Sequence, residues 1–249
     1  MRDINDVLYF RADISPFLVH MTRSREAEDA LPAHDALETI LQQRQLICGP
    51  TLVSDARFGM YTRDLEPDQK QRFFSAICFT ETPLSEVHCL LEIAYRGVDL
   101  APYGLVFLKE PLATLGVSPV LYLNNENADK DSILRALCSL IDEHPCEAAQ
   151  ILPLVSVFGQ KIQPPGAPTR PAGRVDFRWE REWRYPYVNG PLQFTETQVF
   201  IGLCPHEEIS DFETLFPPVG FIDPRRSMKW YATKLIEARQ RLDIKFSVV

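Results

Sequence analysis

Short segments rich in β-branched and aromatic residues recur along this chain without an internal repeat, and amphipathic helical segments separate only some of them. Strands are predicted at residues 17–21, 76–80, 104–108, 119–123, 152–158, 199–203 and 244–248. Helical periodicity predicts helices at residues 34–46, 131–143, 207–215 and 228–242. Because helices follow only some of the strands, we expect an α+β fold with a mainly antiparallel or mixed sheet.

The length and composition of the chain are those of one ordinary globular domain. Its 249 residues are 45% hydrophobic and 24% charged, and we expect a single domain over residues 1–249. No apolar run approaches the roughly 20 residues that span a bilayer. The acidic segment Met1–Asp6 lacks the apolar core of a signal peptide. We therefore expect a cytoplasmic protein with no membrane partner.

Six cysteines are scattered along the chain, and no two of them form a Cys-x-x-Cys pair. Four lie in apolar segments, as expected of reduced, buried thiols in a cytosolic protein: Cys48, Cys78, Cys89 and Cys138. Neither the cysteines nor the five histidines have the spacing of a structural zinc site, so no bound metal is expected.

Two stretches have the composition of long loops. Residues 49–72 are polar and contain glycine and proline, and a loop of that length is uncommon unless it is functional or mobile. Residues 159–176 contain four prolines and three glycines, a composition that opposes regular structure. We expect residues 159–176 to form an exposed loop at the rim of a functional site.

The segment Trp179–Arg184 places two carboxylates two residues apart among aromatic and basic side chains. If it is a strand, alternation puts Glu180 and Glu182 on one face. Like charges side by side cost stability unless each has a partner, which makes the pair a candidate for chemistry. The structural alternative is a solvated edge strand whose acids pair with neighbouring arginines.

The order of several motifs resembles that of a known superfamily. A strand ending in His20-Met21-Thr22 precedes a helix and a long polar loop; a strand closing on Thr80-Glu81-Thr82 follows, and later comes Glu180-Arg181-Glu182. This order resembles the ADP-ribosyltransferase superfamily. It looks most similar to the DarT-type enzymes that modify nucleic acid and to the AbiGi-like abortive-infection proteins of phage defence. The resemblance is carried by short motifs between about residues 8 and 205, and it implies a split, mixed β-sheet with peripheral helices.

The resemblance implies that five residues of the first two motifs bind NAD. His20 would hydrogen-bond a ribose of NAD, with Thr22 beside it. Thr80 and Thr82 would support the site with their hydroxyl groups, and Phe79 would pack near the nicotinamide. Structural alternatives stay open: a core histidine satisfied by a backbone carbonyl, and threonines that simply belong to the end of a strand.

In the third motif, the resemblance makes Glu182 the catalytic carboxylate and Glu180 the residue that helps to position the acceptor. Cleavage of the bond between nicotinamide and ribose passes through an oxocarbenium-like state, which a nearby carboxylate stabilises. NAD is then a substrate, and no metal is required. The chain departs from the family pattern in one respect: the tyrosine that stacks on nicotinamide has no clear counterpart, since Tyr61 lies in the polar loop.

Positive charge gathers just before and within the third motif, although the net charge of the chain is −8. Arginine binds phosphates and stacks on unpaired bases. We therefore expect a nucleic-acid acceptor, single-stranded RNA or DNA, held by Arg170 and Arg174. The alternative is that the basic residues neutralise nearby acids. The basic residues are Lys161, Arg170, Arg174, Arg178, Arg181 and Arg184. Sequence does not rank Arg23, Arg57 and Arg63 as partners of the NAD pyrophosphate.

The expected function is that of an NAD-dependent mono-ADP-ribosyltransferase acting as a toxin or phage-defence effector, with an antitoxin protein as a further partner. Two enzymatic alternatives use the same cleft: a protein-directed ADP-ribosyltransferase and an NAD glycohydrolase, which transfers ADP-ribose to water. The third alternative is a non-catalytic, antitoxin-like interaction protein of the same fold, which the missing tyrosine favours.

Overall fold

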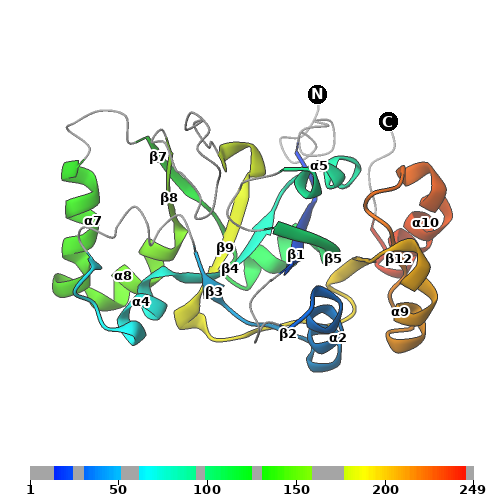
Figure 1. Cartoon of the computed structure of the whole chain (residues 1–249), viewed down its shortest axis with the longest axis horizontal. Helices are drawn as coiled ribbons and strands as arrows, with labels where there is room; N and C mark the ends of the chain where they lie inside the picture. Colours follow the sequence, from blue (N-terminus) through cyan, green and yellow to red (C-terminus); the bar gives the residue numbers. More distant parts are fainter. Residues whose placement is uncertain are drawn as a thin grey trace. The chain divides into compact units, whose positions relative to one another are not determined.

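The computed structural model describes residues 14–24, 31–51, 62–93, 99–124, 131–158 and 177–244 (Figure 1). The chain divides into two compact units, each assembled from segments that are distant in sequence. Unit 1 comprises Met1–Gln45, Phe79–Leu115 and Gln193–Val249, and unit 2 comprises Leu46–Cys78 and Gly116–Leu192. The chain therefore passes between the units after residues 45, 78, 115 and 192. Three of these crossings fall within strands, β2 (Gln45–Leu46), β4 (Ser75–Thr80) and β10 (Leu192–Gln193).

Unit 1 is built around the antiparallel pair of β1 (Phe17–Ser24) and β5 (Asp99–Leu108). β11 (Val199–Leu203) pairs antiparallel with β5 and parallel with β12 (Phe221–Ile222). Every residue of β11 is buried. A strand with no polar face needs cover on both sides, which explains why its sequence is a continuous apolar run rather than an alternation.

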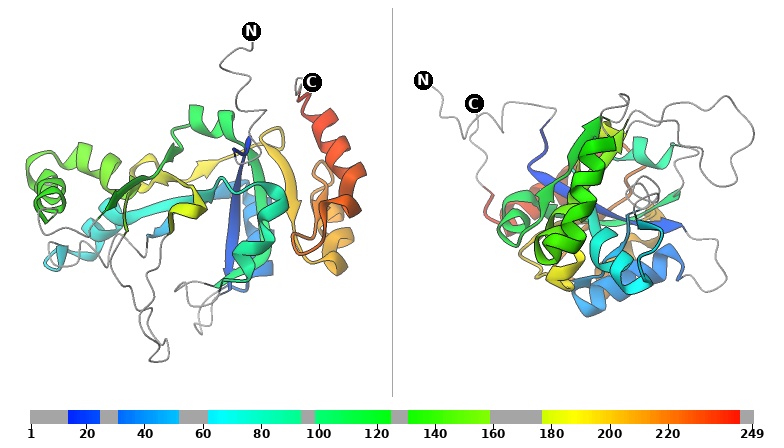
Figure 2. Two further views of the ribbon diagram at one scale, coloured as in Figure 1. Left: turned by 90° about the horizontal axis from the view of Figure 1, so that it is seen from above. Right: turned by 90° about the vertical axis from the view of Figure 1, so that its left-hand side faces the viewer.

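The helices of unit 1 pack against its strands. α2 buries Leu37 and Leu41 and packs against β1 and β5, while α9 and α10 pack against β12 and β11 (Figures 1 and 2). α2 ends at Gln43 because Arg44 adopts the left-handed conformation, with φ of 52°. The helices are α2 (Ala33–Gln43), α5 (His88–Leu91), α6 (Lys109–Thr114), α9 (Ile209–Leu215) and α10 (Ala232–Arg241), with the 3₁₀ turns η2 (Leu84–Glu86), η7 (His206–Glu208) and η8 (Met228–Tyr231).

In unit 2, β9 (Glu182–Pro186) lies between β4 and β6 (Ser118–Pro119), and β3 (Gly49–Pro50) pairs with β4. A separate parallel pair is formed by β7 (Leu121–Asn124) and β8 (Val155–Phe158). The remaining elements are the helices α4 (Pro67–Phe74), α7 (Asp131–Glu143) and α8 (Pro145–Ile151) and the 3₁₀ turns η4 (Leu152–Leu154), η5 (Phe177–Glu180) and η6 (Tyr187–Asn189).

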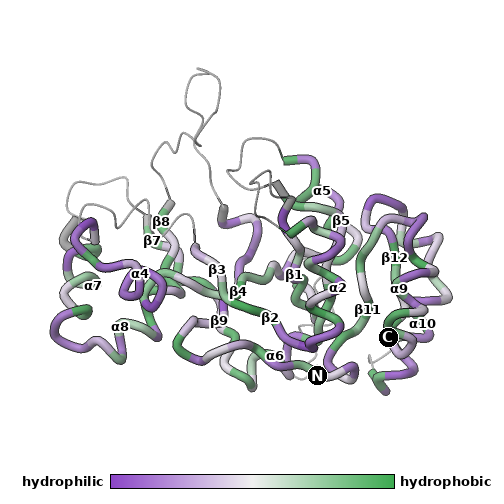
Figure 3. The backbone as a smooth tube through the Cα atoms, turned by 60° about the horizontal axis from the view of Figure 1, so that its bottom comes forward, coloured by the Kyte–Doolittle hydropathy of each residue, from purple (hydrophilic) through white to green (hydrophobic). Residues whose placement is uncertain are grey.

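The core of unit 2 lies among α4, α7, α8 and β8. α4 is hydrophilic over most of its length, and only its last two residues, Phe73 and Phe74, reach this core (Figure 3). They pack with buried residues of the other elements: Leu134, Ile141, Ala148, Ala149, Leu152, Val155 and Val157. The core therefore joins α4 to helices more than 50 residues further along the chain.

Strand pairing is both antiparallel and parallel, and helices accompany the strands in both units, which confirms the α+β class with mixed sheet pairing. The finer expectation of an ADP-ribosyltransferase-like split sheet stays a prediction, as does the single domain over residues 1–249. The helix predicted at 131–143 and the strand predicted at 199–203 have the bounds of α7 and β11.

Other local predictions need correction. The polar excursion at 49–72 is interrupted by α4, which begins at Pro67 and continues to Phe74. Glu66, directly before the helix, and Gln69 form a reciprocal capping box, a start signal that the periodicity alone did not reveal. The strand predicted at 152–158 begins only at Val155, after the turn η4 with its proline. Likewise, the helices expected at 207–215 and 228–242 begin with the turns η7 and η8. The terminal strand at 244–248 lies outside the described residues except for Ile244.

Candidate functional site

The first motif lies on β1 in unit 1. His20 is half-buried, and its ring centroid lies 5.6 Å from that of Phe79 on β4, with the rings tilted by 58°. The strands are neighbours because Val19 pairs with Thr80. Thr22 is buried, and its hydroxyl donates a hydrogen bond to the backbone carbonyl of Tyr103, at 3.3 Å. Two motifs that are about 60 residues apart in the sequence thus meet on adjacent strands.

The second motif closes β4 with a pair of buried hydroxyl groups. The Thr80 and Thr82 side-chain oxygens are 2.7 Å apart, and the Thr82 N–H also donates to the Thr80 oxygen, at 3.2 Å. Each hydroxyl therefore has a local partner that orients it. Because side chains alternate along a strand, Thr80 lies on the same sheet face as Val19, its partner on β1, whereas Phe79 and His20 share the other face.

Glu81, between these threonines, is a residue whose structural importance the sequence analysis missed. Its carboxylate accepts a hydrogen bond from Lys109 Nζ at 2.8 Å, and Lys109 also donates to the backbone carbonyl of Ser15, at 2.7 Å. Glu81 and Lys109 are both buried. This ion pair ties the end of β4 to α6 and to the residues before β1, because a buried charge needs a partner. No local sequence pattern predicts an ion pair between Glu81 and Lys109, because the two residues are 28 positions apart.

The third motif is not a single strand, and the expectation that Glu180 and Glu182 share one strand face is wrong. Glu180 is the last residue of η5, and Glu182 is the first residue of β9. Between them, Arg181 adopts φ of 47°, a left-handed conformation that is unusual for a residue with a side chain. Its N–H donates to the Arg178 carbonyl, which closes the 3₁₀ turn. Alternation applies only to continuous extended backbone.

Glu182 forms a side-on ion pair with Arg184. Arg184 Nε donates to Glu182 Oε1 at 3.0 Å, and Arg184 Nη2 donates to Glu182 Oε2 at 2.8 Å. The remaining terminal nitrogen, Nη1, donates to the carbonyls of Pro153 and Val155. Burial lowers the pKa of Arg184, but the charge of Glu182 outweighs this effect, so the pKa lies above its ordinary value and the guanidinium stays charged.

The backbone of Glu182 is held as well as its side chain. Its N–H donates to the Tyr122 hydroxyl at 2.9 Å, and its carbonyl accepts from the Val120 N–H at 2.9 Å. Burial, together with the nearby charges of Glu182 and Glu180, raises the pKa of Tyr122 to about 12, so the phenol stays neutral at physiological pH. Because each carboxylate oxygen has a second lone pair, a carboxylate fixed in this way can still accept a hydrogen bond from a hydroxyl group.

The basic residues of the third motif differ in their environments. Arg184 is only 2% exposed and holds Glu182, so it does not belong to a surface that binds nucleic acid. Arg178 is exposed and Arg181 is half-buried. Arg170 and Arg174 lie outside the described residues, as do Lys161, Arg57 and Tyr61. Of the pyrophosphate candidates, Arg23 is half-buried on β1, and Arg63 is exposed with its Nε 3.7 Å from Asp64.

The NAD-binding candidates all belong to unit 1, but the structure brings them together only in two pairs, His20 with Phe79 and Thr80 with Thr82, and Phe79 and Thr80 lie on opposite faces of β4: the five candidates are His20, Thr22, Phe79, Thr80 and Thr82. Glu180 and Glu182 belong to unit 2. The expectation that Glu182 shares one cleft with His20 therefore stays a prediction.

Two clusters of side chains among the described residues have the donor types and proximity that a metal ion needs, Glu86–His88–Cys89 and His34–Asp35–Glu38, and both belong to unit 1. Within the described residues, every helix is too short or too polar to cross a bilayer. Comparisons with protein-family models, curated proteins and solved structures found no match.

Proposed function

We propose that this chain is an NAD-dependent mono-ADP-ribosyltransferase that acts on nucleic acid as a toxin or phage-defence effector. The observation that supports the proposal most directly is the meeting of the first two motifs in unit 1. There, the His20 ring lies beside Phe79, and the Thr80–Thr82 hydroxyl pair closes the neighbouring strand. The order of all three motifs in the sequence is the second support.

In this proposal the described side chains bind, orient and stabilise. His20 hydrogen-bonds a ribose of NAD, Phe79 packs near the nicotinamide ring, and the threonine hydroxyls orient the site. The bond between ribose and nicotinamide breaks, the electron pair leaves with nicotinamide, and a nucleophile of the acceptor takes its place on the ribose. Glu182 stabilises the positive charge that develops on the sugar, and Arg184 holds the carboxylate in one orientation.

A second candidate, a non-catalytic interaction protein of the same fold, is favoured by one specific observation. Both oxygens of Glu182 already accept hydrogen bonds from buried Arg184, which is also how a purely structural ion pair is arranged. Such a protein would neither cleave NAD nor label an acceptor.

The two candidates are separated by incubating the full chain with adenine-labelled NAD and pools of RNA, DNA and protein. The proposal predicts label on nucleic acid and release of nicotinamide, with Glu182→Gln lowering the rate about 100- to 1000-fold. Glu147→Gln, an exposed acid on α8 in the same unit, should leave the rate unchanged. Nicotinamide release without labelled acceptor would identify an NAD glycohydrolase, and absence of both would leave the non-catalytic protein.

Glu182→Gln also removes the ion pair between Glu182 and buried Arg184, which costs about 3–5 kcal/mol of stability. The double variant Glu182→Gln/Arg184→Met removes the guanidinium as well, although the carbonyls of Pro153 and Val155 then lose a donor. If Glu182 acts on the reaction, the double variant regains part of the lost stability but stays inactive. If it regains activity along with stability, the catalytic role of Glu182 is wrong.

The double variant Arg170→Ala/Arg174→Ala tests whether the acceptor is nucleic acid. The sequence predicts that these two arginines bind it. Acceptor labelling should fall while NAD binding is unchanged, because the variant removes the proposed phosphate contacts to the acceptor but leaves His20 and Phe79, the proposed NAD contacts, in place. The dependence of labelling on salt should become shallower by about one phosphate contact for each arginine removed. Unchanged labelling would mean that these arginines only neutralise nearby acids, and it would favour a protein acceptor.

A further inference from the structure

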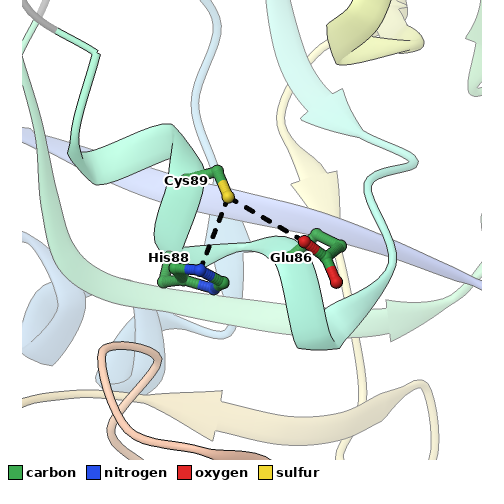
Figure 4. Close-up of side chains that lie close together, drawn as sticks. All are labelled: Glu86, His88 and Cys89. Atoms are coloured by element: carbon green, nitrogen blue, oxygen red, sulfur yellow. Dashed lines mark hydrogen bonds between the residues drawn. The ribbon is translucent and has the colours of Figure 1, made fainter.

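Three side chains with metal-binding donors converge where η2 meets α5. Cys89 Sγ lies 3.5 Å from His88 Nε2 and 3.9 Å from Glu86 Oε2, and the histidine and glutamate side chains both approach the sulfur (Figure 4). Glu86 and Cys89 are exposed and His88 is half-buried, so the donors are open to solvent. The expectation that Cys89 is a buried thiol is therefore wrong.

The backbone beneath these donors is anchored. Val87, between Glu86 and His88, and Leu90, directly after Cys89, are both buried, and α5 packs against β5. Metal binding costs less conformational entropy when the ligands are carried by a segment that is already ordered. Glu86, His88 and Cys89 thus present their donors from a backbone whose position is set by the core of unit 1.

The hydrogen bond of His88 Nδ1 determines the tautomer of the ring, and therefore whether Nε2, which faces the Cys89 sulfur, has a free lone pair. His88 Nδ1 lies 3.0 Å from the backbone carbonyl of Ser85. A carbonyl oxygen only accepts, so Nδ1 carries the hydrogen, and in the neutral ring Nε2 keeps its lone pair. Metal-ligating histidines characteristically donate their other ring N–H to a carbonyl or carboxylate in this manner.

The separation of the sulfur and nitrogen donors matches a tetrahedral zinc site. Zinc–nitrogen bonds of about 2.0 Å and zinc–sulfur bonds of about 2.3 Å at a tetrahedral angle separate the two donors by about 3.5 Å. The observed distance between Sγ and Nε2 is 3.5 Å. The carboxylate oxygen needs about 3.5 Å from the sulfur by the same geometry. It lies 3.9 Å away on an exposed side chain that is able to close the difference.

We propose that Glu86, His88 and Cys89 bind a zinc-class divalent cation. The thiolate and imidazole select a borderline-soft metal over magnesium or calcium, which prefer oxygen donors. Three protein ligands leave a fourth position for water or for a donor from a partner. This metal site is independent of the proposed transferase function. The sequence pattern predicted no bound metal because it lacks the paired cysteines and histidines of a structural zinc site, whereas these three ligands fall within four consecutive residues.

The chain offers matched controls for this site. His144, Cys146 and Glu147 carry the same three donor types and are exposed, but they form no cluster among the described residues. The other cluster of the described residues, His34–Asp35–Glu38, contains no sulfur. A spectroscopic signal that requires thiolate coordination therefore distinguishes the proposed site from both.

The test is titration of the reduced, metal-free full chain with Co²⁺, which gives a thiolate-to-metal charge-transfer absorption band when sulfur is a ligand. The band should saturate at one equivalent and disappear when Zn²⁺ is added. Cys89→Ser should abolish the band, and His88→Ala should weaken Co²⁺ binding about tenfold or more. Glu86→Gln should weaken it less, because an amide oxygen is a poorer ligand. Cys146→Ser, His144→Ala and His34→Ala should leave the band unchanged.

Circular dichroism of each variant checks that the fold is retained, which is expected because Glu86 and Cys89 are exposed and His88 is half-buried. The proposal is overturned if wild type gives no thiolate band with Co²⁺, if the band survives in Cys89→Ser, or if Cys146→Ser removes it. These measurements are made without NAD, so their outcome is independent of the transferase assay.

Discussion

Arginines 178, 181 and 184 lie within seven residues of one another but occupy three different environments. Arg178 is exposed, Arg181 is half-buried with a left-handed backbone, and Arg184 is buried with four side-chain hydrogen bonds. Only the planar fork of arginine serves two carboxylate oxygens and two carbonyls at once. Arg184 therefore supports β9 and η4 through its hydrogen bonds as well as through its charge.

Arg184→Lys should lower the free energy of unfolding by about 2 kcal/mol, because a single ammonium group cannot satisfy all four acceptors. Arg178→Lys makes the same change at an exposed position and should alter it by about 0.5 kcal/mol or less. Denaturant unfolding of both variants checks this difference. Equal stability of the two would mean that Arg184 acts only as a point charge.

At the scale of elements, Gly104 of β5 lies directly against the backbone of β1. A Cβ atom there would lie 2.3 Å from the His20 carbonyl oxygen and 3.1 Å from the Met21 Cα. Both neighbours are backbone atoms of β1, so neither can rotate away. Glycine at this position permits the strand that carries the first motif to pair with β5.

Gly104→Ala should therefore destabilise the protein by about 3 kcal/mol, since the strands must separate to make room. It should also weaken NAD binding if His20 has the proposed role, because β1 moves with the clash. Gly49→Ala is the matched control, since its Cβ would meet no atom within 4 Å. Thermal unfolding and NAD titration measure both effects. A Gly104→Ala protein as stable as Gly49→Ala would show that the close approach is absent in solution.

The end of β12 is held by a buried carboxylate. Asp223 accepts hydrogen bonds from the backbone N–H, Nε and Nη2 of Arg225 and from the His206 N–H. Burial raises the pKa of Asp223, but these hydrogen bonds, led by the Arg225 side chain, outweigh it, and the pKa lies below its ordinary value. A depressed carboxyl pKa stabilises the fold above the unfolded-state value, and this stability is lost as pH falls through the folded-state value.

Asp223→Asn should lower the free energy of unfolding by about 2 kcal/mol at neutral pH, through loss of charge-assisted hydrogen bonds. The difference from wild type should shrink below about pH 4, because the unfolded wild-type chain there binds a proton at Asp223 more readily than the folded protein does. Asp211→Asn, at an exposed position on α9, should show neither effect. Unfolding measured across this pH range tests the sign, and a difference that grows toward acid pH would contradict it.

At the scale of the whole molecule, the chain crosses between its two units four times, so neither unit is a continuous fragment. Residues 116–192 supply β6, β7, β8, β9, α7 and α8 of unit 2, but α4 and β4 come from earlier in the chain. Without them, β9 loses a neighbouring strand and the α7–α8 core loses Phe73 and Phe74.

A fragment of residues 116–192 should therefore lack a cooperative thermal transition. Joining residues 46–78 to residues 116–192 with a flexible linker should restore one, because the missing strand and aromatic residues return. Calorimetry of the two fragments makes the comparison. Cooperative unfolding of the shorter fragment would show that α4 and β4 are not needed for this core.

The sequence by itself determined those elements whose signal is local and periodic. α7 and β11 have the bounds that their apolar patterns predict, because an amphipathic helix and a strand buried on both faces each leave a continuous pattern in the chain. The α+β class followed from the same patterns. Where a turn interrupts the pattern, as at η4 or Arg181, periodicity extended the element too far.

Only the tertiary structure decided which side chains meet. The environment of Glu182 depends on Arg184, Tyr122 and the carbonyls of η4 and β8, and Glu81 depends on Lys109, 28 residues away. The exposed donors at Glu86, His88 and Cys89 depend on the turn between η2 and α5, which buries Val87 and turns Cys89 outward. Periodicity reports which face of an element is apolar, whereas ion pairs and metal ligands depend on distances between side chains, which are set once the elements have packed.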